Sequence, residues 1–90
     1  MLGEGIYLAD KSSKSMQYCG DTYGRKSKRG VLMTCLVSTG ECITFKEQKR
    51  TNNSTASVYA GKADGSENNE WCIKDENAVV PQYIYDIEIL

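Results

Sequence analysis

The ninety residues contain no histidine, and they include only one proline, one phenylalanine and one tryptophan. Without histidine, this stretch holds no Ser-His-Asp or Cys-His catalytic arrangement of its own, so a general base within it must be a carboxylate, a lysine or a tyrosine. No apolar run is long enough to span a membrane, and the start lacks the basic and apolar segments of a secretory signal peptide. The net charge is only −1, so no general attraction to nucleic acid or to a membrane is expected.

The four cysteines, Cys19, Cys35, Cys42 and Cys72, are scattered and form no C-x-x-C pair. A zinc site made only of these thiols has little support, so we expect no metal. Free and mostly buried thiols are the expected state without a secretory signal, which indicates an intracellular protein, nuclear or cytoplasmic. The length allows one small domain that buries only about 60–65% of its unfolded surface.

The segment 3–19 predicts a glycine-rich turn, a short strand and then a helix. Asp10 closes the apolar run and is a good N-cap, because its carboxylate accepts from the free N–H groups of a first helical turn. Gly20 stands where a glycine that ends the helix is expected. The basic cluster at 25–29 is interpreted as part of a solvated loop, with a contact for ligand phosphates or an acidic partner as the alternative.

The centre of the chain predicts two strands. Residues 30–37 are nearly all apolar and often β-branched, which favours a strand buried on both faces at the centre of a sheet. A turn then leads to a second strand at 42–45, so we expect a hairpin. Within the stretch 46–70, residues 49–55 are highly polar and are predicted to be exposed, whereas the segment 56–61 is predicted to pack on the core through Val58 and Tyr59.

The C-terminal part predicts two more strands. Residues 70–75 form the first, and strict alternation over 83–90 places Tyr83, Tyr85 and Ile87 on one face of a half-buried strand. Pro81 fits just before this strand, where no N–H is needed for the ladder.

Two segments carry a resemblance to a known family. G-E-G-I-Y-L-A-D at 3–10, followed by S-K-S-M-Q-Y-C at 13–19, resembles the nicotinamide-pocket segment of the poly(ADP-ribose) polymerase catalytic domain, written G-x-G-I-Y-[FL]-A-D and then S-K-S-x-x-Y-C. This long match is far more specific than an isolated G-x-G. Residues 75–84 are similar to the family segment D-x-x-Q-x-x-P-E-Y-[LI], and Gln82 stands at the position of its catalytic glutamate.

The resemblance implies a set of pocket residues for NAD+. Gly5 belongs to the turn, and Tyr7 matches the tyrosine of the family's His-Tyr-Glu triad, which flanks the nicotinamide. Tyr18 matches the tyrosine that stacks on the ring, Ser15 the serine that hydrogen-bonds the carboxamide, and Lys14 the lysine beside it. A planar cation between two aromatic faces gains about 0.5–2 kcal/mol from each. Taken without the resemblance, Tyr7 and Tyr18 are better interpreted as core aromatics with satisfied hydroxyls.

The sequence departs from the family pattern at two points. The triad histidine has no counterpart, and we expect the donor-binding half that carries it to lie before Met1 or on another chain. Gln82 keeps a hydrogen-bond acceptor but lacks the charge that stabilises an oxocarbenium and orients an acceptor for elongation. Polymer elongation should therefore fail, and mono-transfer would need a carboxylate from the substrate. Gln82 as an ordinary surface residue remains an open alternative.

We therefore predict an α+β domain with the ADP-ribosyltransferase fold, built from a mixed, mostly antiparallel sheet and one short helix. Residues 1–90 would be the C-terminal half of a catalytic domain like that of poly(ADP-ribose) polymerases. The expected function is NAD-dependent mono-ADP-ribosyl transfer to an acceptor protein, with Gln82 and Tyr7 at the catalytic positions. The alternative is an inactive domain that acts as a binding or scaffold module. We expect no membrane partner, and nothing in the sequence indicates nucleic acid.

Overall fold

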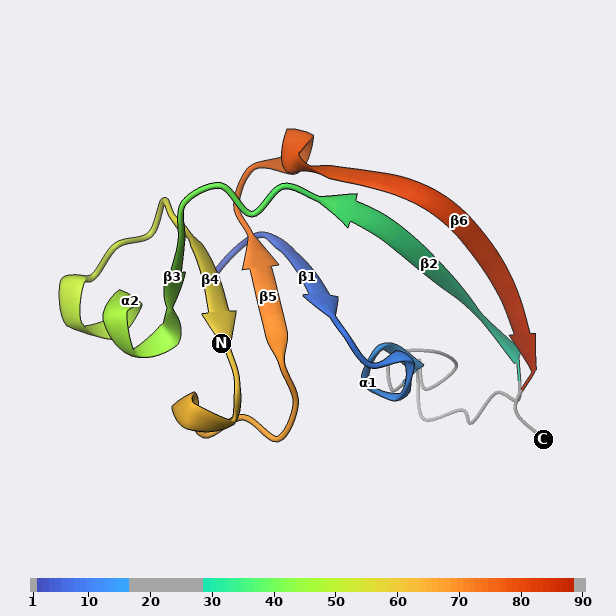
Figure 1. The fold of residues 1–90 in the computed structure, drawn as a ribbon, viewed down its shortest axis with the longest axis horizontal. Helices are drawn as coiled ribbons and strands as arrows, with labels where there is room; N and C mark the ends of the chain where they lie inside the picture. Colours follow the sequence, from blue (N-terminus) through green and yellow to red (C-terminus); the bar gives the residue numbers. More distant parts are fainter. Residues whose placement is uncertain (1, 17–28, 89–90) are drawn as a thin grey trace.

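The structure is a computed structural model that describes residues 2–16 and 29–88. The described residues form strands and short helices in an α+β arrangement (Figure 1). The strands are β1 (Ile6–Ala9), β2 (Arg29–Val37), β3 (Cys42–Thr44), β4 (Ser57–Ala60), β5 (Glu70–Ile73) and β6 (Val79–Glu88). The helices are α1 (Ser12–Met16), α2 (Phe45–Thr51) and two single 3₁₀ turns, η2 (Lys62–Asp64) and η3 (Glu76–Ala78).

The strands divide between two sheets. A four-stranded sheet has the order β1-β5-β4-β3, in which β3 runs parallel to β4 and the other neighbours are antiparallel. A separate two-stranded ribbon pairs β2 with β6 and curves away from the first sheet (Figure 1). The prediction of mixed, mostly antiparallel pairing within an α+β fold is compatible with this arrangement.

The predicted hairpin between 30–37 and 42–45 is wrong. β2 pairs antiparallel with β6 along its whole length, whereas β3 pairs parallel with β4. The physical reason is length, because β6 offers a partner for every residue of β2 and the three residues of β3 would leave most of its backbone groups unpaired.

The predicted burial of this region is also wrong. In β2, the exposed fractions of Val31 and Leu36 are 56% and 58%, although the sequence favoured a central strand. The strand predicted from residue 83 onward is part of β6 as far as Glu88, but it is not half-buried, because Tyr83 and Ile84 are 61% and 67% exposed. A two-stranded ribbon lacks flanking strands, so its apolar side chains have little to pack against.

Pro81 lies within β6 rather than before it. It pairs with Cys35, while the next pair in the ladder joins Thr34 to Tyr83, so Gln82 is the extra residue of a β-bulge. A proline is tolerated at such a position because the ladder is already interrupted there.

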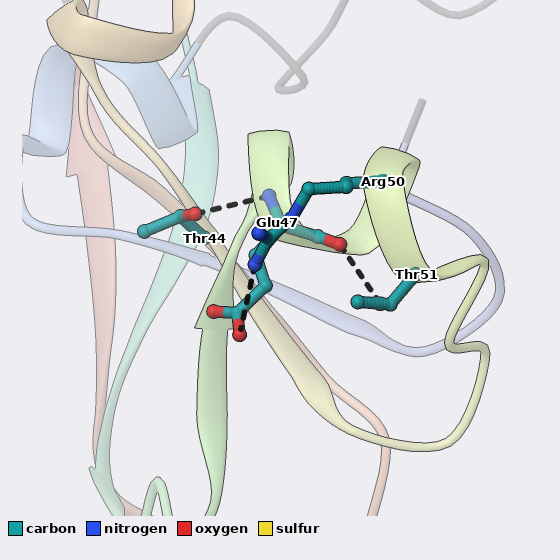
Figure 2. A network of polar contacts seen from close by, with 4 residues as sticks. All are labelled: Thr44, Glu47, Arg50 and Thr51. Carbon is teal, nitrogen blue, oxygen red and sulfur yellow. Dashed lines mark hydrogen bonds and ion pairs between the residues drawn. The ribbon is translucent and has the colours of Figure 1, made fainter.

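Helix α2 was not predicted, because the sequence favoured a strand at 42–45 and an exposed polar segment at 49–55. Thr44 caps the helix by accepting a hydrogen bond from the Glu47 backbone N–H at 3.2 Å, and Figure 2 shows the two residues facing each other. Asn52 ends it in the left-handed conformation, with its N–H bonded to the carbonyl of Gln48 at 2.8 Å. The T-x-x-E spacing followed by an asparagine is a capping signature that the sequence displayed.

Helix α1 lies inside the predicted helix, and the predicted end at Cys19 and Gly20 falls outside the described residues. Its N-cap position is occupied by Lys11, whose carbonyl accepts from the N–H groups of Lys14 and Ser15. Asp10 is therefore not the N-cap. Its carboxylate instead accepts a hydrogen bond from the Asn69 side chain at 3.0 Å, which ties the end of β1 to the start of β5.

The core lies in the four-stranded sheet. Leu2, Val58, Ala60 and Cys72 are buried against one another, and Ile43 and Phe45 pack against this cluster. The predicted packing of Val58 is thus confirmed. Tyr59, on the other face of β4, contacts Trp71 with the ring centroids 5.0 Å apart.

Candidate functional site

The glycine turn approaches strand β5 so closely that a side chain is excluded. A Cβ added to Gly5 would lie 2.6 Å from the Cys72 sulfur and 2.8 Å from the Ile73 carbonyl oxygen. Gly3 has a φ of +98°, a conformation that side chains rarely adopt. The two glycines are therefore required by the path of the backbone into β1.

The carbonyl groups of the turn are held by side chains from distant parts of the chain. Lys74 donates hydrogen bonds from its ammonium to the carbonyls of Leu2 at 2.9 Å and Glu4 at 2.8 Å. The Gln48 side-chain amide donates to the Leu2 carbonyl as well, at 3.2 Å. These contacts fix the turn against both α2 and the end of β5.

Tyr7 follows the turn in β1, and its hydroxyl donates a hydrogen bond to the Gly3 carbonyl. This bond occupies the hydroxyl and sets the direction of the ring, whose side chain remains 42% exposed. Partial burial raises the pKa of Tyr7 above its ordinary value, and the neighbouring Cys72 thiol and Glu70 carboxylate act in the same direction. Tyr7 is therefore a neutral hydrogen-bond donor at physiological pH.

A cleft of about 870 Å³ opens beside Tyr7. Three elements and one loop contribute to it: β1, α1, the start of β5 and the segment that precedes β5. Its lining residues are Tyr7, Leu8, Ala9, Lys14, Ser15, Ser66, Glu67 and Glu70. The cleft thus combines an aromatic ring, apolar residues of β1, two serine hydroxyls, one cation and two carboxylates.

A second cleft, of about 520 Å³, separates β1 from the β2–β6 ribbon. It shares Tyr7, Leu8, Ala9 and Ser15 with the first cleft, and its other walls are largely apolar. The lining residues that it adds are Ile6, Met33, Thr34, Cys35, Val37, Thr39 and Trp71. The two clefts therefore meet along β1, which is the edge strand of the four-stranded sheet.

The structure brings three of the predicted site residues together: Tyr7, Lys14 and Ser15 all line the larger cleft. Gly5 lies in the adjoining turn and does not line it. Tyr18 lies outside the described residues.

Gln82 stands apart from the other predicted site residues. It occupies the bulge of β6, is exposed to solvent, and lines neither cleft. A bulge re-aims the side chain that it carries, and bulges are frequent next to active sites. The described geometry does not itself join Gln82 to Tyr7.

Three polar residues of the larger cleft were not predicted for the site: Ser66, Glu67 and Glu70. Glu70 enters the cleft only because β5 pairs with β1, and strand pairing leaves no local mark in the sequence. Ser66 and Glu67 belong to the turn-rich segment before β5, which carries no motif. No sequence signal was available for these residues.

The described segments also bear on a metal site, a membrane-spanning helix and free thiols. No group of three or more cysteine, aspartate or glutamate side chains within residues 2–16 and 29–88 is arranged to hold a metal ion. None of the helices in these segments is long and apolar enough to cross a membrane. Cys35, Cys42 and Cys72 are free thiols, and burial raises the pKa of Cys42.

Comparison with known proteins yields one match. The family model of the poly(ADP-ribose) polymerase catalytic domain matches residues 1–87. No curated protein and no solved structure matches the chain. The matched range includes the glycine turn, both clefts and the bulge at Gln82.

Proposed function

Because the chain belongs to the poly(ADP-ribose) polymerase catalytic-domain family, we propose that it uses NAD+ as its substrate and transfers single ADP-ribosyl groups to an acceptor protein. The observation that carries this proposal is the cleft that brings together Tyr7, Lys14 and Ser15, the residues that match the family's nicotinamide pocket. The use of NAD+, the transfer of single groups and the protein acceptor are all parts of this proposal.

The cleft suits a nicotinamide ring. Tyr7 offers an aromatic surface whose hydroxyl is already held by the Gly3 carbonyl, so the ring is presented in a fixed direction. Ser15 is half-buried at the cleft wall and has a hydroxyl for the carboxamide. We assign Tyr18 to the opposite face of the ring, by its position in the family motif.

Transfer of single groups follows from the amide at Gln82. A glutamine accepts a hydrogen bond from a ribose hydroxyl, but it carries no charge to stabilise an oxocarbenium or to orient a second ADP-ribose as acceptor. In the proposed reaction, the bond between ribose and nicotinamide breaks, nicotinamide leaves as a neutral molecule, and a carboxylate of the acceptor protein forms the new bond to the ribose carbon.

Gln82 also favours a second function, that of a domain that binds its ligand without catalysis. At Gln82 an amide stands in place of the family's catalytic carboxylate. A domain of this kind would bind nicotinamide or ADP-ribose without turnover and act through protein contacts. Mono-transfer and this binding role differ in whether the bond to nicotinamide is ever cleaved.

Two measurements on the purified chain test these proposals. We expect nicotinamide to bind in a calorimetric titration and Tyr18→Ala to abolish that binding while the chain remains folded by circular dichroism. Incubation with NAD+ and an acceptor protein, followed by mass spectrometry, should then show single ADP-ribosyl groups, and Gln82→Glu should raise the rate.

Three outcomes separate the alternatives. Binding without any transfer, in the wild type and in Gln82→Glu alike, rejects the transferase and supports the binding module. Polymer chains from the wild type contradict the role assigned to Gln82. A folded chain that binds no nicotinamide contradicts the pocket itself.

A further inference from the structure

The charges that line the larger cleft are unequal. Lys14 contributes one positive charge, whereas Glu67 and Glu70 contribute two negative ones, so the lining carries a net charge of −1. Glu67 is exposed, but Glu70 is only partly accessible to solvent. A carboxylate in such a position is less screened by water than one on an open surface, so its field extends into the cleft.

Strand pairing places Glu70 on the same side of the sheet as Tyr7. Glu70 pairs with Ala9 on one side and with Ala60 on the other, while Tyr7 pairs with Cys72. Residues that are directly opposite, and residues two apart in one strand, share a face, so Tyr7 and Glu70 are diagonal neighbours. Cβ atoms in such pairs lie about 7–8 Å apart, which leaves room for a flat molecule to contact both side chains.

Glu70 has no cation to neutralise it within residues 2–16 and 29–88. The one salt bridge between described side chains joins Arg50 to Glu47, on the far helix α2. Lys14 also lines the cleft, but no ion pair between these described residues joins its ammonium to the Glu70 carboxylate. The Glu70 carboxylate contributes to the raised pKa of Tyr7, which is consistent with its lying in the same cleft as the tyrosine ring.

We propose that Glu70 gives this cleft selectivity for a positively charged aromatic ring, so that it recognises the cationic nicotinamide of NAD+ in preference to neutral nicotinamide or the neutral ring of NADH. This inference rests on the proposed function, because it names the charge state of the ligand in that same site. Tyr7 supplies the ring surface, and Glu70 supplies the negative charge beside it.

The proposal has a consequence for the stage at which Glu70 acts. The attraction is present while the ring is cationic and disappears when the bond to ribose breaks and nicotinamide leaves as a neutral molecule. Glu70 therefore stabilises the bound substrate and not the transition state, so it strengthens binding without accelerating cleavage. This behaviour suits a domain that retains its ligand, and it distinguishes Glu70 from the glutamate that the family places at the position of Gln82.

The test compares two ligands of similar shape and different charge. 1-Methylnicotinamide is a cation, nicotinamide is neutral, and each is titrated into wild type, Glu70→Gln and Glu76→Gln by calorimetry. Glu76 is the matched control, because it is exposed in η3, lies outside both clefts and changes the net charge by the same amount.

We expect Glu70→Gln to weaken binding of 1-methylnicotinamide by about fivefold or more and to change nicotinamide binding by less than about twofold. Added salt should weaken the cation's binding to wild type and have a smaller effect on its binding to Glu70→Gln. Glu76→Gln should behave as wild type with both ligands.

Three other results would each overturn the inference. An equal loss of both ligands in Glu70→Gln indicates a structural role and overturns the inference. Unchanged binding of the cation also overturns it, while nicotinamide binding to the wild type would leave the proposed function standing. If the folded wild type binds neither ligand, the pocket assignment fails and the inference fails with it.

Discussion

Tyr7 connects the turn, the core and the cleft through a single side chain. Its hydroxyl bonds to the Gly3 carbonyl, its strand partner is the buried Cys72, and its ring lines both clefts. A residue in this position affects the stability of the turn and the recognition of a ligand together. Its protonation is accordingly the first property to measure.

The raised pKa of Tyr7 predicts a loss of stability in alkaline solution. The folded state holds the Tyr7 proton more tightly than the unfolded state, whose tyrosine has the ordinary pKa of 10.0. Stability from this group is therefore complete below pH 10.0 and is lost as the pH rises through the higher folded pKa. Urea unfolding across this range should show a steeper decline for wild type than for Tyr7→Phe.

Tyr83→Phe is the control for this experiment, because it removes a hydroxyl from a ring that is 61% exposed. Each substitution removes one tyrosine, so the contributions of the other titrating groups to the pH dependence cancel when the two variants are compared. Parallel declines for wild type and Tyr7→Phe above pH 10.0 would show that the pKa of Tyr7 is not raised.

Gly5→Ala tests the close approach between the turn and β5. The new methyl group would lie 2.8 Å from the Ile73 carbonyl oxygen, so the backbone must move. We expect a loss of about 1–3 kcal/mol in the free energy of unfolding, measured with urea. Gly40→Ala is the comparison: no atom lies within 4 Å of its added Cβ, and only its φ of +52° opposes the change, at about 1 kcal/mol. A smaller loss for Gly5→Ala than for Gly40→Ala would contradict the geometry of the turn.

At the scale of single elements, helix α2 depends on its caps. It has seven residues, and isolated helices of this length are unstable in water. The Thr44 hydroxyl bonds to the Glu47 N–H, while Phe45 packs on the core cluster. The helix therefore forms because a cap and a partly buried aromatic act on its first turn.

Thr44→Ala should lower the free energy of unfolding by about 0.5–2 kcal/mol, because it leaves the Glu47 N–H without its partner. Arg50→Ala is the matched control on the same helix. Its ion pair with Glu47 spans 3.9 Å and its side chain is 76% exposed, so the expected change is below about 0.5 kcal/mol. The arrangement in Figure 2 would be refuted if the two substitutions had equal effects in urea unfolding.

The β2–β6 ribbon is the element that most departs from its sequence pattern. Large apolar side chains are exposed on both of its faces, including Met33 and Ile84 on one and Leu36 and Tyr83 on the other. The two-residue period is kept on each side of the bulge at Gln82, so the pattern identified the strand but not its surroundings.

At the scale of the whole molecule, burial is concentrated in one sheet. The Cα radius of gyration is 14.3 Å, whereas a compact domain of this length would have about 12 Å. The ribbon that extends from the four-stranded sheet accounts for this open shape (Figure 1). The stability of the chain therefore rests on the cluster around Leu2, Val58 and Cys72.

A pair of identical substitutions tests this distribution. Ile73 is 1% exposed, so Ile73→Val should cost about 0.5–1.5 kcal/mol in the free energy of unfolding. Ile84 is 67% exposed, so Ile84→Val should change it by less than about 0.5 kcal/mol. Both are measured with urea at neutral pH. An equal or larger cost at Ile84 would mean that the ribbon face is covered in solution.

Much of the local structure could be predicted from the sequence. The turn, β1, β5 and the start of α1 follow from glycines, short apolar runs and helical spacing, which act between residues close in the chain. Helix α2 was predictable too, because Thr44, Glu47 and Asn52 stand at capping positions. Tyr7, Lys14 and Ser15 were identified through a contiguous motif, and the structure brings them to one cleft.

The sequence by itself thus determined the elements and the family motif of this protein. Only the tertiary structure decided that β2 pairs with β6, that Gln82 occupies a bulge, and that Glu70 faces the same cleft as Tyr7. The physical reason is that strand pairing joins residues far apart in the chain, and any apolar strand satisfies the pattern of several partners. The strand pairing that forms depends on how many backbone groups become hydrogen-bonded together. That number is a property of the assembled chain and not of any segment.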